Sequence, residues 1–195
     1  YTASALKLKE ALAGGAWSGN GKLEVLSQLM RLRQICCDPA LCFEDYTGES
    51  AKLETCVSLI ASASAAGHKI LLFSQFASML ERIRERLLQE GISSHLLVGA
   101  TPKEERSRMV QAFASDEVPV FLISLKAGGT GLNLTAADIV IHYDPWWNVA
   151  AQNQATDRAY RIGQEKPVTV YKLILKDTIE ENLLKLQNAK LALAA

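Results

Sequence analysis

The sequence lacks an excess of charge, a paired cysteine motif and a long apolar run. Its 195 residues include 21 Lys and Arg against 21 Asp and Glu, and this balance argues against a wholly basic nucleic-acid-binding protein while allowing a local basic surface. None of the four cysteines forms a CxxC pair, and the three histidines lie in other segments, so no metal site is predicted. The adjacent Cys36 and Cys37 are predicted to be small buried residues in a reducing compartment. The apolar runs are too short to cross a bilayer, so no membrane association is expected.

A complete site for a nucleoside triphosphate is also missing. The stretch AWSGNGKL (16–23) has the outline of a phosphate-binding GxxxxGK[ST] loop, but Ala16 replaces its first glycine and Leu23 its magnesium-binding hydroxyl. No GxGxxG motif follows a strand, which argues against a dinucleotide enzyme. The acidic pair Asp116 and Glu117 comes before an apolar run and not after it. The chain alone is therefore not expected to hold a nucleotide and its magnesium.

The sequence does contain an alternation of short apolar runs with helical segments. Five runs predict buried strands, at residues 69–74, 95–99, 118–125, 138–144 and 168–175. Such strands are expected to form a parallel sheet covered by helices on both faces, so the predicted fold class is α/β. Thr101-Pro102-Lys103-Glu104 predicts a helix that the Thr101 side chain caps. Ligands bind at the carboxyl ends of such strands, so function is sought in the loops that follow them.

Helical signals flank this alternating part. Residues 1–50 are expected to be a helical lead-in and linker, with a helix from Leu23 that stops before Pro39. Residues 51–176 are the predicted α/β domain, and residues 177–195 a last helix that packs on it. The opening residues look like the middle of a longer protein.

A glycine-rich loop follows the third predicted strand. In SLKAGGTGLNLTAAD (124–138), three glycines allow close backbone approach to a ligand, and Lys126, Thr130 and Asn133 add hydrogen-bond donors. This composition suits an anion such as a phosphate. A plain glycine-rich connection between two strands explains the loop equally well.

Two further segments follow the next strand. In YDPWWN (143–148), two adjacent tryptophans cannot enter the same core, so one is expected either to cover a helix end or to stack on a base or sugar. A helix predicted over residues 149–161 would place Gln154, Arg158 and Arg161 in one polar stripe. Arginine suits phosphate oxygens, but such a stripe is also typical of a solvated helix surface.

Together these segments resemble, in order and spacing, the SWI/SNF family of DNA-dependent ATPases within helicase superfamily two. The resemblance rests on KILLFSQF, LVGATPKEER, LKAGGTGLNLTAADIVIHYDPWWN and QATDRAYRIGQ as the family's motifs, and on LRQICCDPAL as the sequence before its second lobe. The Trp-Trp form resembles bacterial members. Val149 stands where the family usually has proline and Tyr160 where it commonly has histidine, which is expected to weaken the start of the helix and not the chemistry.

The resemblance implies that the chain is the second, C-terminal RecA-like lobe. The first lobe would hold ATP and Mg²⁺. The residues implied to be catalytic are Arg158 and Arg161, as arginine fingers, and Gln154. Those implied to lie at the nucleotide are Gly129, Gly131 and Asn133. Those implied to hold double-stranded DNA are Ser74, Gln75, Gly99, Lys126, Thr130 and Trp147.

The whole protein is then expected to be an ATP-driven DNA translocase of the bacterial cytoplasm, associated with the nucleoid. Its expected partners are duplex DNA, the first lobe and a DNA-bound protein cargo, and this chain alone is expected to be inactive as an ATPase. An ATP-independent α/β module that docks nucleic acid or protein is the alternative. A stand-alone small-molecule enzyme is disfavoured because no acid–base pair or nucleophile is found, and His142, inside a strand pattern, is predicted to be a core residue.

Overall fold

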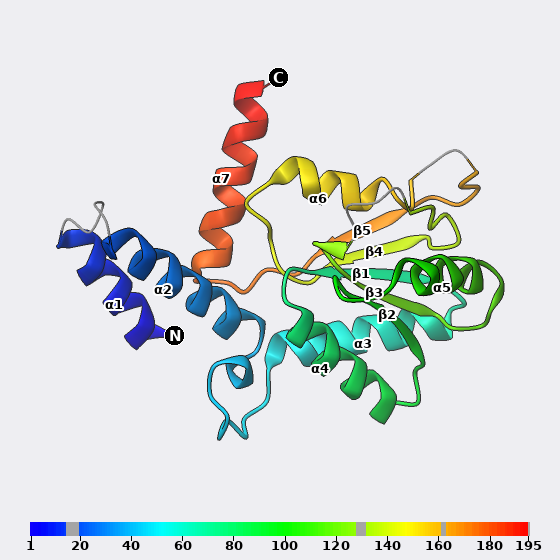
Figure 1. The fold of residues 1–195 in the computed structure, drawn as a ribbon, viewed down its shortest axis with the longest axis horizontal. Coiled ribbons are helices and arrows are strands. Elements are labelled where there is room, and N and C mark those ends of the chain that lie inside the picture. Colours follow the sequence, from blue (N-terminus) through cyan, green and yellow to red (C-terminus); the bar gives the residue numbers. More distant parts are fainter. Residues whose placement is uncertain (15–19, 128–131, 161–162, 195) are drawn as a thin grey trace.

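The computed structural model describes residues 1–14, 20–127, 132–160 and 163–194, and its elements alternate as expected of an α/β fold (Figure 1). The chain opens with α1 (Thr2–Ala13), α2 (Asn20–Cys37) and the 3-10 turn η1 (Pro39–Leu41). The alternating part comprises α3 (Ala51–Ala65), β1 (Ile70–Ser74), α4 (Ala77–Gln89), β2 (Ser94–Leu97), α5 (Lys103–Ser115), β3 (Val120–Ser124), β4 (Ile139–His142), α6 (Val149–Thr156) and β5 (Thr169–Lys172). The last helix is α7 (Ile179–Ala194).

Among the described residues, five strands form one parallel sheet with the order β2-β3-β1-β4-β5. The central strand β1 sets the register, because Ile70 pairs with Val120 of β3 on one side and with Ile139 of β4 on the other. The predicted α/β fold class is thus confirmed. The strands are mostly shorter than the apolar runs that predicted them, because each run extends into the neighbouring loop.

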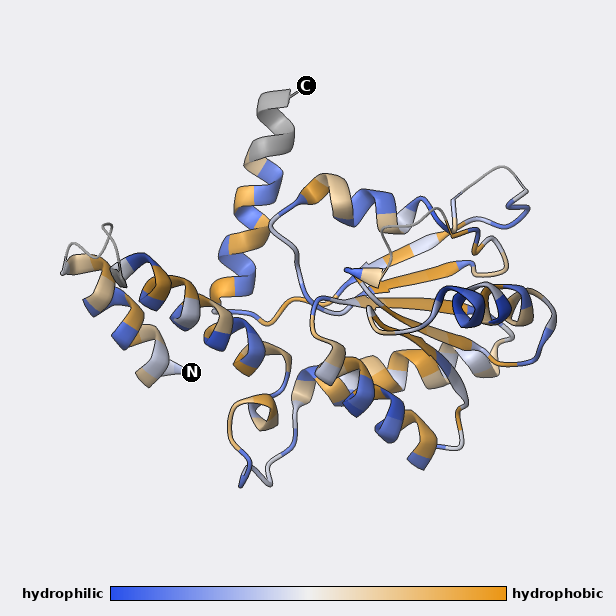
Figure 2. Cartoon of the chain, viewed as in Figure 1, coloured by the Kyte–Doolittle hydropathy of each residue, from blue (hydrophilic) through white to orange (hydrophobic). Residues whose placement is uncertain are grey.

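Helices cover both faces of the sheet. Side chains alternate along a strand, so Leu72 and Leu122 join the apolar cluster under α3 and α4, whereas Leu71 and Phe121 join the cluster under α5 and α6. Figure 1 shows α6 on the opposite side of the sheet from α3 and α4. Figure 2 shows hydrophobic residues along the strands and hydrophilic residues on the outward side of α5.

The last strand, β5, does not fit the prediction that helices cover both faces of the sheet. It pairs with β4, and all four of its residues are exposed, including Val170 and Tyr171 at 39% and 38%. The strand itself was predicted correctly from its apolar run. The predicted cover is wrong for this edge strand, whereas the other edge strand, β2, is partly buried.

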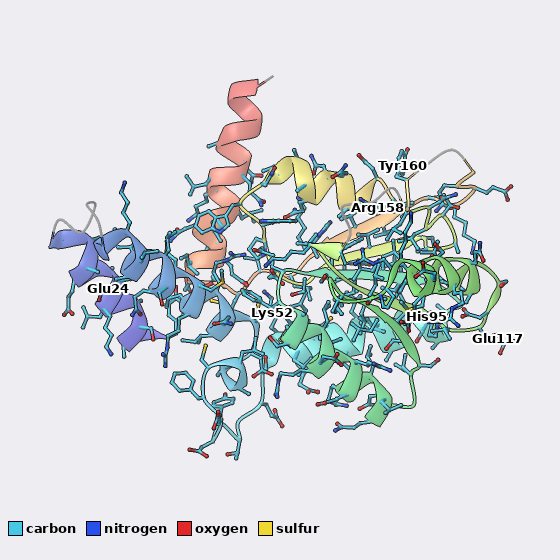
Figure 3. All side chains as sticks on the ribbon, in the orientation of Figure 1. Glu24, Lys52, His95, Glu117, Arg158 and Tyr160 are labelled. Carbon is cyan, nitrogen blue, oxygen red and sulfur yellow. The ribbon has the colours of Figure 1, made fainter. Side chains whose placement is uncertain are left out.

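The lead-in helices form a second, smaller packing unit beside the sheet. Leu8 of α1 and Val25 and Leu32 of α2 make its apolar cluster, and Ile179 at the start of α7 packs against it. Nζ of Lys52, in the first turn of α3, lies 2.6 Å from Oε1 of Glu180 in the first turn of α7. Figure 3 labels Lys52 at this junction, and Figure 1 shows α7 leaving the junction away from the sheet. The expected domain boundaries themselves stay predictions.

The helix cap predicted at Thr101 is wrong. Helix α5 begins after Pro102, which occupies the cap position without a side-chain hydrogen bond. The Thr101 hydroxyl instead accepts a hydrogen bond from Val98 N at 3.1 Å, and Arg106 Nε donates to Thr101 O at 2.8 Å. Thr101 therefore lies one residue before the cap position, and its hydroxyl closes the loop after β2.

The start of α6 is intact although the family's usual proline is missing. The Asn148 side chain accepts a hydrogen bond from Ala151 N at 3.2 Å, and such a cap satisfies an amide that the first turn leaves open. Whether the missing proline weakens this helix start stays a prediction.

The predicted length of α6 is wrong. The helix ends at Thr156 and not at residue 161. Gln154 is exposed, whereas Arg158, in the turn beyond the helix, is 2% exposed. The two side chains therefore do not form the solvent-facing stripe that a continuous helix would give.

Other local predictions are confirmed. Helices α3 and α4 end just before Gly67 and Gly91, whose φ angles of 84° and 73° are readily adopted by glycine. Cys36 and Cys37 are 2% and 0% exposed, as expected of small buried residues. His142 is 2% exposed, with Nε2 2.9 Å from Thr156 Oγ1, as expected of a core histidine with a polar partner.

Candidate functional site

The carboxyl ends of β1 and β4 meet at what we call the β1–β4 corner: Ser74, Gln75, Asp144, Pro145 and Trp147. Ser74 Oγ donates to Asp144 Oδ1 at 2.5 Å, and Gln75 N donates to Asp144 Oδ2 at 3.2 Å. Gln75 Nε2 donates to Pro145 O at 2.9 Å. The corner thus brings together Ser74, Gln75 and Trp147, three of the residues predicted to hold DNA.

Ser74 has an internal position in this corner. Its side chain is fully buried and turned to Asp144, which is itself 2% exposed. The hydroxyl therefore organises the corner from within, and a contact between Ser74 and DNA stays a prediction. Gln75, by comparison, is only half-buried.

The two tryptophans part, as expected. Trp146 packs against the apolar cluster under α5 and α6, and its backbone N–H donates to Gln152 Oε1 at 3.1 Å. Trp147 is 43% exposed. Of the pair, Trp147 is the more exposed and so the one that a ligand can reach.

A second group of candidate residues surrounds Arg106. Its Nη2 donates to Gly99 O at 2.8 Å, and its Nη1 donates to Ala127 O at 3.4 Å. Gly99 and Lys126 are both exposed. Arg106 therefore joins the loop after β2 to the start of the glycine-rich loop after β3, which sets two predicted DNA contacts near each other.

A third group lies around Arg158, which Figure 3 labels together with Tyr160 on the segment beyond α6. Leu134 N donates to Arg158 O at 3.1 Å, so the backbone beside Asn133 is bonded directly to that of Arg158. Asn133 is exposed and Arg158 is buried. The structure thus brings Asn133 and Arg158 together, while Gln154 lies on the exposed side of α6.

Gln164 closes this third group from the other side. Its Nε2 lies within hydrogen-bonding distance of Thr135 O (3.0 Å), Ala137 O (2.7 Å) and Ala159 O (3.1 Å). The end of the glycine-rich loop and the segment with Arg158 are therefore held to each other at both ends. Gly129, Thr130, Gly131 and Arg161, which the sequence also singled out, lie outside the described residues.

Comparison with known proteins decides the family. Residues 51–163 match the family model described as the helicase conserved C-terminal domain. The solved C-terminal domain of the Sulfolobus solfataricus SWI2/SNF2 ATPase is 32% identical, with a TM-score of 0.74 over 95% of this chain and 79% of that one. The chain is a SWI/SNF-type helicase C-terminal lobe.

Two further relatives give the SWI/SNF lobe its wider context. The solved Sulfolobus solfataricus SWI2/SNF2 ATPase core in complex with dsDNA is 34% identical, with a TM-score of 0.82, and the match covers 98% of this chain and 42% of that one. The Bacillus subtilis protein YwqA, whose name places it among ATP-dependent helicases or translocases, is 46% identical over 170 residues, 83% of this chain and 18% of its own length. The lobe therefore spans less than a fifth of that curated relative.

Burial controls the charges of the SWI/SNF lobe near the β1–β4 corner. It raises the pKa of Asp144 from its ordinary value, although hydrogen bonds from Ser74 and Gln75 and the charges of Lys52 and Arg33 oppose the change. Asp144 therefore needs those partners to be a stable buried acceptor. Burial also lowers the pKa of His142 to about 4, so this histidine is neutral at pH 7.

Sequence reasoning missed three residues that organise the SWI/SNF lobe: Arg33, Asp144 and Gln164. Each stands inside a motif already quoted for the resemblance. Their partners, however, lie in other segments that a linear motif does not identify. Arg33 and Gln164 donate to distant backbone carbonyls, and Asp144 accepts from Ser74 and Gln75. Only the residue type could have indicated the importance of Arg33 and Asp144, because a buried arginine or carboxylate requires a hydrogen-bonding partner.

Within the described parts of the SWI/SNF lobe, three or more His, Cys, Asp or Glu side chains nowhere gather into a group that could hold a metal ion. None of the helices in those same parts has the length and apolar character needed to cross a membrane.

Proposed function

We propose that this lobe is one half of an ATP-driven motor that moves along double-stranded DNA. The observation that carries the proposal is the hydrogen bond from Leu134 N to Arg158 O, which joins the glycine-rich loop to the segment with the candidate arginine fingers. The name of the relative YwqA supports ATP dependence. The related ATPase core solved with dsDNA supports the nucleic acid partner.

For the nucleotide, we assign Arg158 and Arg161 as arginine fingers and Gln154 as the residue that orders the attacking water. Guanidinium groups fit phosphate oxygens, and an arginine finger stabilises charge on the transferring phosphoryl group. Arg158 is 2% exposed in this lobe, so its side chain has to turn outward when a first lobe closes on it. Gly129, Gly131 and Asn133 would lie beside the nucleotide.

We assign ATP and Mg²⁺ mainly to the first lobe. Magnesium prefers carboxylate and water oxygens, and the carboxylate of the β1–β4 corner, Asp144, already accepts hydrogen bonds from Ser74 and Gln75. ATP supplies the phosphoryl group whose transfer drives the motor, and the arginine donors of this lobe complete the site around it.

For DNA, we assign the β1–β4 corner and the loops joined by Arg106. Gln75, Gly99, Lys126 and Thr130 would contact phosphates, which fix position without reading sequence, and Ser74 would support them. Trp147 would stack on a sugar or base at the groove. The motor would act in the bacterial cytoplasm on the nucleoid, with a DNA-bound protein as its cargo.

The test is Arg158→Ala in a protein that carries both lobes, measured as steady-state ATP turnover with duplex DNA. Loss of an arginine finger is expected to lower turnover by roughly 10³–10⁵-fold, which is about 4–7 kcal/mol of barrier. Arg84→Ala is the matched control, because Arg84 is exposed on α4 and should leave turnover unchanged.

Unchanged turnover in Arg158→Ala would contradict the proposal and favour an ATP-independent docking module. The 195-residue chain gives a second test. It is expected to hydrolyse no ATP and to bind duplex DNA weakly, with an affinity that falls as salt rises. DNA-stimulated hydrolysis by this chain alone would show that the site is not shared with a first lobe.

A further inference from the structure

Arg33 is a buried arginine on the lead-in helix α2, outside the residues that match the helicase family model. Its residue is 3% exposed, and it lies 18 residues before the matched range begins at residue 51. A guanidinium removed from water is costly unless its donors and its charge are matched. The contacts of the Arg33 side chain therefore indicate its role.

Those contacts all lie in or beside the β1–β4 corner. Arg33 Nη2 donates to Pro145 O at 3.1 Å and stands 4.0 Å from Asp144 Oδ2. The guanidinium carbon lies 5.7 Å from the ring centre of Phe76 and 5.5 Å from that of Trp147. Arg33 therefore contacts two aromatic rings, a carbonyl and, more distantly, a carboxylate.

The carbonyl of Pro145 is a shared acceptor. It takes a hydrogen bond from Gln75 Nε2 at 2.9 Å as well as the one from Arg33. The side chain of Gln75 and the backbone before the tryptophan pair are thus held at the oxygen that α2 also holds. A displacement of α2 would disturb Gln75 and Trp147 together.

We infer that Arg33 is a positioning residue that holds Trp147 and Gln75 in place for DNA and so makes DNA affinity depend on the lead-in helix. This inference rests on the proposed DNA-binding function of the corner. The guanidinium is the chemistry that the position requires, because it is planar, stacks on aromatic rings and offers several donors at once. A lysine ammonium is a compact point charge and cannot reproduce that set of contacts.

The experiment compares the 195-residue chain with Arg33→Lys, Trp147→Ala and the double variant, by anisotropy of a labelled DNA duplex at low salt. Arg33→Lys is expected to weaken binding about fivefold, the size of a coupling of roughly 1 kcal/mol. The double variant is expected to bind no more weakly than Trp147→Ala alone. Arg31→Lys is the matched control, because Arg31 lies on the same helix but stacks on Phe43, with 5.3 Å between its guanidinium carbon and the ring centre.

A second readout tests the placement of Trp147 without DNA. In a Trp17→Phe chain, the difference in acrylamide quenching with and without Trp147→Phe isolates the Trp147 emission. Arg33→Lys should make that emission more quenchable, while Arg31→Lys should not. Arg33→Gln, which keeps one donor for Pro145 O, serves as the second variant if Arg33→Lys does not fold.

Wild-type affinity and quenching in Arg33→Lys would overturn the inference. The inference would also be overturned if the double variant lost DNA affinity by the product of the two single losses. Arg33 would then affect DNA binding by a route that does not involve Trp147. If the parent chain fails to bind duplex DNA at all, the proposed function of the corner fails. The quenching result still decides whether Arg33 positions Trp147.

Discussion

The buried pair of Lys52 and Glu180 carries the first prediction. Lys52 Nζ lies 2.6 and 2.7 Å from the two carboxylate oxygens of Glu180, and the two side chains are 4% and 1% exposed. Lys52 Nζ also lies 5.1 Å from the ring centre of Tyr143, and Leu175 N donates to Glu180 Oε2 at 2.8 Å. One pair thus joins α3, the chain after β4 and the start of α7.

Removal of either partner leaves the other buried and unmatched, but the two losses respond differently to pH. Glu180→Gln leaves an ammonium, at a cost of about 3–5 kcal/mol that acid cannot relieve. Lys52→Met leaves a carboxylate that can take up a proton. Burial already raises the pKa of Glu180, while Lys52 lowers it in part, so removal of Lys52 raises that pKa further.

The sign follows from the raised pKa of this acid. A carboxyl whose folded-state pKa lies above its unfolded-state pKa contributes stability at low pH and loses it as pH rises through the folded-state value. A proton bound only in the folded state adds about 1.4 kcal/mol per pH unit of acidification. Lys52→Met should therefore recover stability, relative to wild type, as the pH falls from 7 toward 5.

The assay is urea unfolding followed by circular dichroism at several pH values, for wild type, both single variants and Lys52→Met/Glu180→Gln. The double variant should be more stable than Glu180→Gln alone and should lack the recovery in acid. Lys185→Met is the control, because Lys185 pairs with Glu181 at 3.6 Å on the surface of α7 and its loss should change nothing. Equal pH slopes in the two single variants would refute the reasoning.

Two further predictions concern titrating groups. The pKa of His142 is lowered by burial from 6.5 to about 4, so protons bind the unfolded state first as pH falls; the free energy of unfolding should drop by about 3 kcal/mol from pH 6.5 to pH 4. His142→Gln should reduce that slope in urea titrations, and an unchanged slope would exclude His142 as its source. Burial raises the pKa of Cys36 to about 11 and of Cys56 to about 12, and it raises the pKa of Cys37 well above the ordinary thiol value. Only the half-buried Cys42 should therefore react rapidly with a thiol reagent at pH 8, all four should react in urea, and rapid reaction of two or more in the native chain would contradict the burial.

The sheet could be predicted from the sequence because its signal is local. Each central strand is fully buried, so a short apolar run such as Ile70–Ser74 marks it without reference to any other segment. No comparable sequence pattern indicates that β5 lies at the edge of the sheet. Its apolar residues look the same in the sequence, and only the order of strands in the sheet shows that they stay exposed.

Local signals failed where a residue makes contacts that its own motif does not indicate. Thr101 has the sequence of a helix cap, but Pro102 occupies the cap position and the Thr101 hydroxyl accepts from Val98 N. Arg33 and Asp144 stand in different motifs and meet only because α2 packs against the end of β4. No spacing along the chain encodes a contact between residues 112 positions apart, such as that from Arg33 to Pro145.

The end of α6 shows how such a contact changes the site. The pattern of Gln154, Arg158 and Arg161 continues a helical period, yet the helix stops at Thr156. Beyond it, the carbonyl of Arg158 accepts from Leu134 N, and Gln164 reaches the carbonyls of Ala159, Thr135 and Ala137. The segment with Arg158 is therefore bonded both to the end of α6, through Arg158 N and Ala155 O, and to the end of the glycine-rich loop, so a ligand that moves Leu134 would also move the backbone of Arg158.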